Sequence, residues 1–170
     1  MPVFNDSDEN LPETVTAALR RLEGPTRRFM VAPKSGFHKL VKGETCLLLD
    51  AGPAPQEPFG DGAHAGALGF ELQSGASRIV TSCGYSPEVD IDWRAAVRRT
   101  SAHSTLVIAG EDSAPFHRNE ETGLTFPDGP EGIFAKRLEE ADEIWLDAQH
   151  AGYKTPFGLL HRRRLFMSGD

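Results

Sequence analysis

The sequence predicts an all-β fold, an antiparallel β-sandwich with one helix near the N-terminus and a short helical turn near residues 92–100. Short apolar runs recur along the 170 residues and are separated by turn signals, with 17 Gly and 12 Pro spread over the chain. Hydrophobic residues make up 39% of the sequence and include 10 Phe, which is enough to fill a core. A chain of this length typically forms one domain.

Residues 13–23, "ETVTAALRRLE", are expected to form the helix. Their apolar positions recur at helical spacing on one face, and a Gly-Pro pair directly after them is a stop signal. The positions on that face are Val15, Ala18, Leu19 and Leu22. We therefore divide the chain into a helical lead-in over residues 1–26 and a β-sandwich domain over residues 27–170.

The strands are predicted from short apolar or β-branched runs bounded by Gly, Pro and polar residues. Strands are expected at 27–32, 36–43, 45–52, 66–72, 77–84 and 102–110. The fourth and fifth runs are joined by "QSGA", a connection typical of a hairpin. The acidic stretch 111–131 predicts a long surface loop with little regular structure. Three successive antiparallel strands are expected at 132–140, 143–152 and 158–169.

Charge and hydropathy exclude several classes of protein. The formal net charge is −7, and Arg and Lys are scattered apart from "HRRR" at 161–164, which argues against nucleic acid as a partner. An acidic polysaccharide remains compatible with the sequence, because a groove needs only local positive charge. No run approaches the ~18 apolar residues of a transmembrane helix. The start, "MPVFNDSDENLP", lacks the basic and apolar segments of a signal peptide.

Two of the six histidines, His64 and His103, differ from the others in their surroundings. Each precedes a strand-like run, and each is flanked by small residues that let a ligand or another backbone come close. One interpretation is a site for a divalent cation, with zinc as the first choice and Asp61 or water completing the shell. The other interpretation is that both histidines are structural.

Two further groups of residues each allow two interpretations. Arg94, Arg98 and Arg99 lie in the predicted helical turn, where they would either bind a carboxylated sugar or form a solvated face with salt bridges. Trp93 and Trp145 would either stack on sugar rings or pack in the core. The apolar runs around both tryptophans favour the core.

Several motifs together resemble one known family. The stretches "AHAGALGFEL", "RIVTSCG", "WRAAVRRTSAHSTLVI" and "WLDAQHAGYKTPFGLLHRRRLFMSGD" occur in the order seen in heparinase II/III-like proteins. The resemblance implies a bacterial polysaccharide lyase with an N-terminal α/α-toroid and a C-terminal antiparallel β-sandwich. On this basis the chain is expected to be a fragment that covers the start of the β-sandwich domain, without the toroid and the later strands.

The resemblance also implies a chemistry, the β-elimination of uronate-containing acidic glycans. In the family, the toroid supplies a Tyr and an Asn or His, while the β-domain supplies a catalytic His and, in several members, a metal site. Gly62 stands at the position of that catalytic histidine, and His64 matches the first metal ligand. Ser82 stands where the family has a metal-binding Asp, and His103 matches the last ligand. The chain by itself is therefore expected to be inactive.

Three functions follow from this comparison of motifs. The first is a portion of a polysaccharide lyase, with Arg94 and Arg98 as candidate substrate-binding residues and one divalent metal ion as candidate cofactor. The second is a non-catalytic glycan-binding or structural β-domain in envelope polysaccharide metabolism, which Gly62 and Ser82 motivate. The third is a metal-dependent enzyme of another chemistry on the same sandwich. The family implies a periplasmic or cell-envelope setting, but the sequence leaves the localisation open.

Overall fold

The computed structural model describes residues 13, 16–17, 20, 30–55, 60–84, 90–118, 120 and 125–169. The helical lead-in that we predict at residues 1–26 lies outside the described residues except for four positions. Those four, Glu13, Thr16, Ala17 and Arg20, are helical and exposed.

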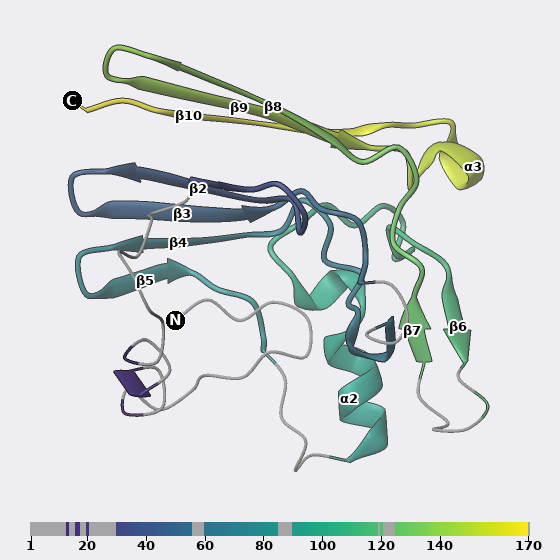
Figure 1. Cartoon of the computed structure of the whole chain (residues 1–170). Helices are drawn as coiled ribbons and strands as arrows, with labels where there is room; N and C mark the ends of the chain where they lie inside the picture. The colour runs from purple at the N-terminus through teal and green to yellow at the C-terminus, as the bar shows by residue number, and fades with distance from the viewer. Residues whose placement is uncertain are drawn as a thin grey trace.

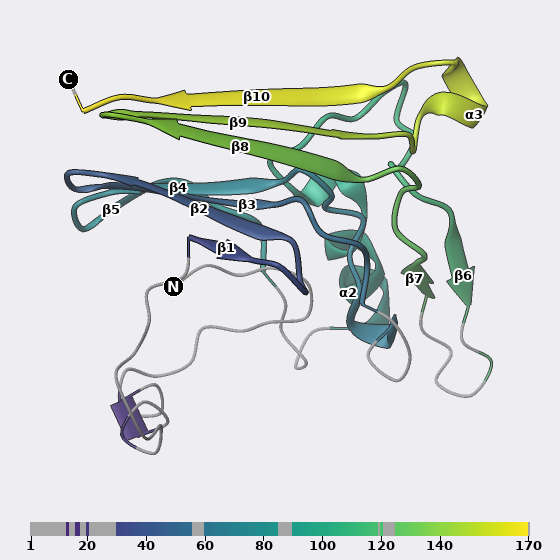
Figure 2. The ribbon, with the colours of Figure 1, turned by 45° about the horizontal axis from the view of Figure 1, so that its top comes forward.

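Two antiparallel sheets pack face to face, as the sequence predicts for a sandwich (Figures 1 and 2). The first sheet has the order β1-β2-β3-β4-β5, with β1 (Val31–Ala32), β2 (Phe37–Lys42), β3 (Thr45–Asp50), β4 (Phe70–Ser74) and β5 (Ser77–Val80). The second has the order β10-β9-β8, with β8 (Phe134–Glu140), β9 (Glu143–His150) and β10 (His161–Met167). Consecutive strands are neighbours in each sheet, although β3 and β4 are joined by a longer segment that contains η1, and β9 and β10 by one that contains α3.

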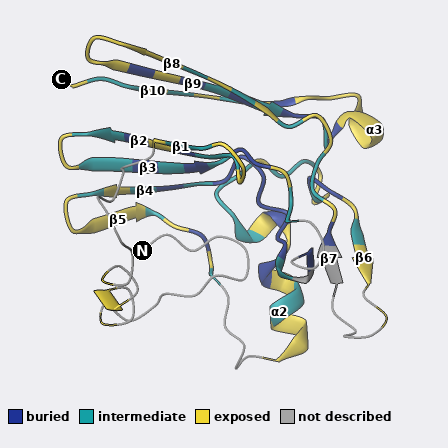
Figure 3. Ribbon diagram, viewed as in Figure 1, coloured by how far each residue is buried: buried dark blue, intermediate teal, exposed yellow. Residues whose placement is uncertain are grey.

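The core lies between the two sheets because apolar residues alternate along their strands. Leu40, Leu47 and Leu49 of the first sheet pack in one cluster with Ile144 and Leu146 of the second. Along β9, buried residues alternate with more exposed ones, which is the period of a strand with one covered face (Figure 3). Each fully buried leucine or isoleucine contributes roughly 1.5–3 kcal/mol to folding.

The predicted helical turn near 92–100 is confirmed as two short helices. Helix α2 (Ile91–Val97) begins after Asp90, whose carboxylate accepts the N–H groups of Asp92 at 3.0 Å and Trp93 at 2.9 Å. The 3-10 helix η2 (Thr100–Ala102) follows it. Two more short helices are η1 (Gly60–Gly62) and α3 (Lys154–Phe157). Among the described residues, no helix has both the length and the apolar character needed to span a membrane.

The prediction of a strand at residues 102–110 is wrong. This segment is a loop that ends in an isolated bridge between Ile108 and Glu111. The hydroxyl side chains of this loop form hydrogen bonds to backbone groups in and near β4. These bonds take the place of the backbone hydrogen bonds that a paired strand would make. Ser104 Oγ accepts the Phe70 N–H at 2.8 Å and donates to the Phe70 carbonyl, while Thr105 Oγ1 donates to the Ala67 carbonyl at 2.7 Å.

Two other expectations need correction. The stretch 111–131 contains a short hairpin of β6 (Phe116–Arg118) and β7 (Thr125–Pro127), although we expected little regular structure. Trp93 and Trp145 are not core residues, because they are 57% and 46% exposed. Trp145 lies on the outer face of β9, where the alternation of the strand places it.

A buried polar cluster fixes the end of the second sheet. The Gly152 N–H donates to His150 Nδ1 at 3.1 Å, so the proton of neutral His150 is on Nε2, which lies 2.9 Å from Nδ1 of His161. Burial holds the pKa of both histidines at about 4. Tyr153, which is fully buried, donates from its hydroxyl to the Leu106 carbonyl at 2.6 Å. This cluster therefore joins β9 and β10 to the loop before residue 111.

Candidate functional site

The structure brings His64 and His103 together from loops that are distant in sequence. Their ring centroids are 5.3 Å apart, with an angle of 54° between the planes. His64 lies in the loop between η1 and β4 and is 7% exposed, while His103 follows η2 and is half-buried. The pairing that the sequence suggested is thus present in the fold.

Gly66 allows the two histidine loops to approach each other. A Cβ atom at this position would lie 3.1 Å from Cγ of His103 and 3.3 Å from its Nδ1. These contacts are tighter than a side chain normally accepts, so the His103 ring lies directly on the Gly66 backbone. Gly66, a small residue close to His64 in sequence, therefore makes room for the ring of His103.

Ser82 lies beside this pair, as the family motif predicts for a third ligand. It is buried, and its Oγ is 3.5 Å from Nδ1 of His103. The Cys83 N–H donates to the Ala102 carbonyl at 3.3 Å, which holds the segment after β5 against η2. Three segments of the chain therefore converge at one site.

His103 is a neutral imidazole at physiological pH. Burial and, to a smaller extent, the neighbouring His64 lower its pKa to about 4, although the Val97 carbonyl opposes this shift. Its Nε2 atom is buried and makes no hydrogen bond to any residue that the structure describes. A neutral ring with a buried, unsatisfied nitrogen is suited to bind a ligand.

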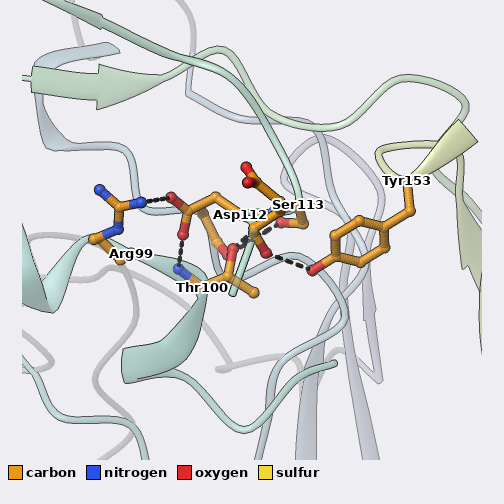
Figure 4. Close-up of polar contacts among 7 residues, drawn as sticks. Arg99, Thr100, Asp112, Ser113 and Tyr153 are labelled. Atoms are coloured by element: carbon orange, nitrogen blue, oxygen red, sulfur yellow. Dashed lines mark hydrogen bonds and ion pairs between the residues drawn. The ribbon is translucent and has the colours of Figure 1, made fainter. Parts of the chain in front are cut away.

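A network of hydroxyl and carboxylate groups fixes the backbone next to His64 and His103, and Figure 4 shows its contacts among Arg99, Thr100, Asp112 and Ser113. Thr100 Oγ1 donates to the Ala65 carbonyl at 2.8 Å and accepts the Ser113 N–H at 2.8 Å. Asp112 accepts the Thr100 N–H at 2.8 Å and pairs with Arg99 at 2.7 Å. Because Thr100 and Ser113 are fully buried, these bonds are protected from water and order the site.

Arg163 of β10 is a positioning residue that the sequence did not single out. Its guanidinium donates to the Leu68 carbonyl at 2.5 Å and to the Ser104 carbonyl at 2.8 Å, one in each histidine loop. The same group lies 5.0 Å from the centroid of the Phe70 ring. The sequence did contain a signal for Arg163, because successive residues of a strand face opposite sides of the sheet. Of the three arginines in "HRRR", only the middle one points inward.

His64 also lines a cavity of about 370 Å³ that contains a second group missed in the sequence, Asp50. Burial raises the pKa of Asp50 to about 7, although the Gly52 N–H donates to its carboxylate at 3.1 Å and opposes the shift. Lys34 and Phe37 are further lining residues. The cavity thus combines a carboxyl group that can exchange a proton near neutral pH, a histidine and a cation.

The described residues do not fit a zinc centre. Zinc takes three or four nitrogen, sulfur or carboxylate ligands, and the described part of the chain contains no group of three such side chains. Ser82 offers only a hydroxyl where the family has an aspartate. A cation at His64 and His103 therefore stays a prediction, and it requires water or Asp61, whose side chain lies outside the described residues.

The remaining predicted site residues differ in their surroundings. Gly62 is the last residue of η1 and brings no side chain to the position of the family's catalytic histidine. Arg94 is half-buried in α2, and its role in substrate binding stays a prediction. Arg98 is 1% exposed, and its carbonyl accepts the Ala65 N–H at 2.9 Å next to His64.

Comparison with known proteins identifies relatives for most of the chain. Residues 24–170 match the family described as heparinase II/III-like, C-terminal. A curated relative, FtsZ-localized protein C of Caulobacter vibrioides, is 34% identical over 98% of the chain. The chain spans 29% of the length of that relative.

Solved structures share the fold at low sequence identity. The heparan sulfate lyase HepC from Pedobacter heparinus matches 99% of the chain with a TM-score of 0.68 at 19% identity. A heparinase III matches the same share with a TM-score of 0.69, also at 19% identity. In both cases the match covers less than a third of the solved chain, 28% and 27%.

Proposed function

This chain belongs to the heparinase II/III-like C-terminal family, and we propose that it is the β-sandwich part of a polysaccharide lyase for uronate-containing acidic glycans. The observation that carries the proposal is the meeting of His64, Ser82 and His103 at the family's motif positions, next to the cavity that holds Asp50. Catalytic residues from outside this chain would complete the site, because Gly62 provides no side chain.

The proposed reaction is a β-elimination. A base removes the proton from C5 of the uronate, and the electron pair of that bond passes into an enolate-like form of the carboxylate. The C4–O bond then breaks as a C4–C5 double bond forms, and the leaving oxygen takes a proton from an acid. The reaction thus requires a base, an acid and a group that stabilises negative charge on the carboxylate.

Within this scheme, the chain would contribute one wall of the substrate site. Lys34 supplies a positive charge at the cavity and would stabilise the enolate-like carboxylate. Neutral His103 would hydrogen-bond to the substrate without adding charge, and His64 would line the same site. Asp50, with its pKa near 7, would exchange a proton with a group in the cavity.

The test is turnover by the intact protein. It would be incubated with heparan-type and alginate-type chains, and the unsaturated product would be followed by its ultraviolet absorbance. We expect product from one of these chains and a fall of about tenfold or more in kcat/KM for Lys34→Met. Lys154→Met in α3 is the matched control. The lyase proposal fails if no acidic polysaccharide gives an unsaturated product.

A second candidate is a non-catalytic glycan-binding or structural β-domain in envelope polysaccharide metabolism. Gly62 and Ser82 favour it because they replace the family's catalytic histidine and metal-binding aspartate. The curated relative is named for localisation with FtsZ and not for an enzymatic activity. Glycan binding by calorimetry without turnover, and unchanged by His64→Ala, would select this candidate over the lyase.

A further inference from the structure

The outer face of the second sheet carries exposed apolar side chains across its three strands. Leu138 on β8 lies opposite Trp145 on β9, and Trp145 lies opposite Phe166 on β10. These residues are 47%, 46% and 49% exposed, and the Trp145 and Phe166 ring centroids are 4.4 Å apart. We call these three residues, two aromatic rings and one leucine, the aromatic row. The core lies on the other face of this sheet, because Ile144 and Leu146 alternate with Trp145 along β9. The first sheet packs on that other face (Figure 2).

Cations lie directly beside the aromatic row. Lys136, Arg162 and Arg164 share the same outer face and are called the basic patch. Arg162 and Arg164 both pair with Asp147, yet their side chains stay 49% and 63% exposed. Because the patch has three cations for this one carboxylate, it is locally positive on a chain whose formal net charge is −7.

A groove of about 300 Å³ runs between the aromatic row and the basic patch. It is lined by Lys136, Leu138, Trp145, Leu146, Asp147 and Arg164. Trp145 and Arg164 are diagonal neighbours on adjacent strands, because Trp145 pairs with Phe166, two positions from Arg164. Such neighbours are about 7–8 Å apart, so an aromatic ring and a guanidinium face the groove at a separation comparable to the width of a sugar ring. An indole face packs well on the C–H groups of a pyranose, and a guanidinium binds carboxylate and sulfate groups.

We propose that this groove is a second binding site for an acidic oligosaccharide, separate from the His64 cavity. The ligand class rests on the proposed function, while the position of the site rests on the exposed aromatic row and the basic patch. A glycan chain can follow the groove and avoid the hairpin end of the sheet. At that end, exposed Glu143 accepts the Trp145 indole N–H at 3.3 Å and stands beside exposed Glu140, so a flat anionic bilayer would meet both carboxylates. A glycan chain would contact the indole face and the basic patch, so the geometry favours the glycan.

A larger cavity in the described part of the chain does not suit this ligand. It has a volume of about 550 Å³ and lies between η2, the β6–β7 hairpin and α3. Its lining includes Glu111, Asp112, Asp128 and Glu131, and its arginine, Arg99, is paired with Asp112. An acidic sugar would be repelled there, so an acidic glycan discriminates between the two surfaces.

The experiment measures binding of size-defined heparin and alginate oligosaccharides to the intact protein by calorimetry. We expect Trp145→Ala to raise Kd about tenfold and Arg164→Gln about threefold, and we expect added salt to weaken binding. Trp93→Ala, which removes another exposed tryptophan, and Lys154→Gln are matched controls and should bind like the wild type. A neutral dextran should bind far more weakly. Melting curves verify that each variant is folded.

Three results would overturn the proposal. They are wild-type affinity in both Trp145→Ala and Arg164→Gln, no binding of acidic oligosaccharides by the intact protein, and Trp145-dependent binding of phosphatidylserine vesicles in place of glycans. The test is independent of the lyase proposal. Trp145-dependent binding without any unsaturated product would refute only the lyase, whereas product formation with unaltered binding in both variants would refute only the second site.

Discussion

Ser82 stands at the position of a third ligand beside the predicted metal-binding histidine pair. It is buried with its Oγ 3.5 Å from Nδ1 of His103, so a carboxylate at this position would reach the same site. We predict that Ser82→Asp raises zinc affinity by about tenfold or more, because it converts two ligands into three. Calorimetric titration and metal analysis of the purified protein measure this change.

The matched control for that substitution is Ser101→Asp, which adds a carboxylate at an exposed position of η2. It should leave zinc affinity unchanged. If Ser82→Asp binds no more zinc than the wild type, then His64 and His103 do not form part of a metal site even with an added ligand.

Asp50 should make the protein less stable as the pH rises. Its pKa is about 7 in the folded protein, compared with 3.8 as its ordinary value, so the folded state binds the proton more tightly between these values. Ionisation therefore costs folding free energy as the pH rises from about 4 to 7. We predict that Asp50→Asn raises the free energy of unfolding at pH 7.5, on the order of 2 kcal/mol, and leaves it unchanged at pH 4.

Urea unfolding at both pH values tests this prediction. Asparagine keeps an oxygen that accepts the Gly52 N–H, so the turn at residue 52 is preserved. Asp142→Asn, at an exposed position, is the control and should show no such pH-dependent gain. An equal effect of Asp50→Asn at both pH values would contradict a buried carboxyl group with a raised pKa.

The residues of the site differ in how far sequence could identify them. His64 and His103 stand out through their small neighbours and their motif positions. Asp50 gave no such signal, because its pKa depends on burial by segments 34–37 and 52–55. The sequence around Trp145 was misleading, because its apolar neighbours suggested a core position. Those neighbours lie on the opposite, buried face of β9.

Strand β10 joins the second sheet to both histidine loops through one side chain. Arg163 donates to the Leu68 and Ser104 carbonyls, whereas Arg164 on the same strand points outward. We predict that Arg163→Met lowers the free energy of unfolding by about 2–4 kcal/mol, because two buried carbonyls lose their partner. Arg164→Met should change it by less than ~0.5 kcal/mol.

Urea unfolding and histidine NMR signals measure both consequences of Arg163→Met. The signals of His64 and His103 should broaden or shift in this variant, because its loops lose their connection to the sheet. Equal stability of Arg163→Met and Arg164→Met would show that the arginine does not hold these loops.

At the scale of elements, the alternation of apolar and polar residues predicted strands correctly where one face of the strand is buried. Strands β8, β9 and β10 follow the three runs that we expected near the C-terminus. The run at 102–110 is richer in β-branched residues than these strands but forms a loop, because Ser104 and Thr105 bind carbonyls of neighbouring segments. Composition does not reveal that competition, since it depends on which backbone groups lie within reach.

For the whole molecule, three histidines whose pKa lies at about 4 should make folding sensitive to acid. Burial lowers the pKa of His103, His150 and His161 from 6.5 to about 4. The unfolded chain binds more protons between pH 4 and 6.5, so stability falls as the pH falls through this range. Asp50 contributes the opposite slope, but one carboxyl is outweighed by three imidazoles.

We therefore predict that the free energy of unfolding falls by several kcal/mol from pH 7 to pH 4.5. Urea unfolding over a series of pH values measures the slope, and the Asp50→Asn background isolates the histidines. His161→Gln should make the slope shallower, because it removes one of the three imidazoles whose pKa is lowered. A free energy of unfolding that stays constant from pH 7 to 4.5 would contradict the proposed neutral histidines.

The sequence by itself determined the all-β class, most strands and the family, because alternation, turn residues and motif order are local properties. Only the tertiary structure decided which groups meet. It placed Ser82 against His103, enclosed Asp50 beside His64, turned Arg163 inward and left Trp145 exposed. The physical reason is that contacts, burial and pKa depend on segments that are distant in the chain and that come together only when the two sheets pack.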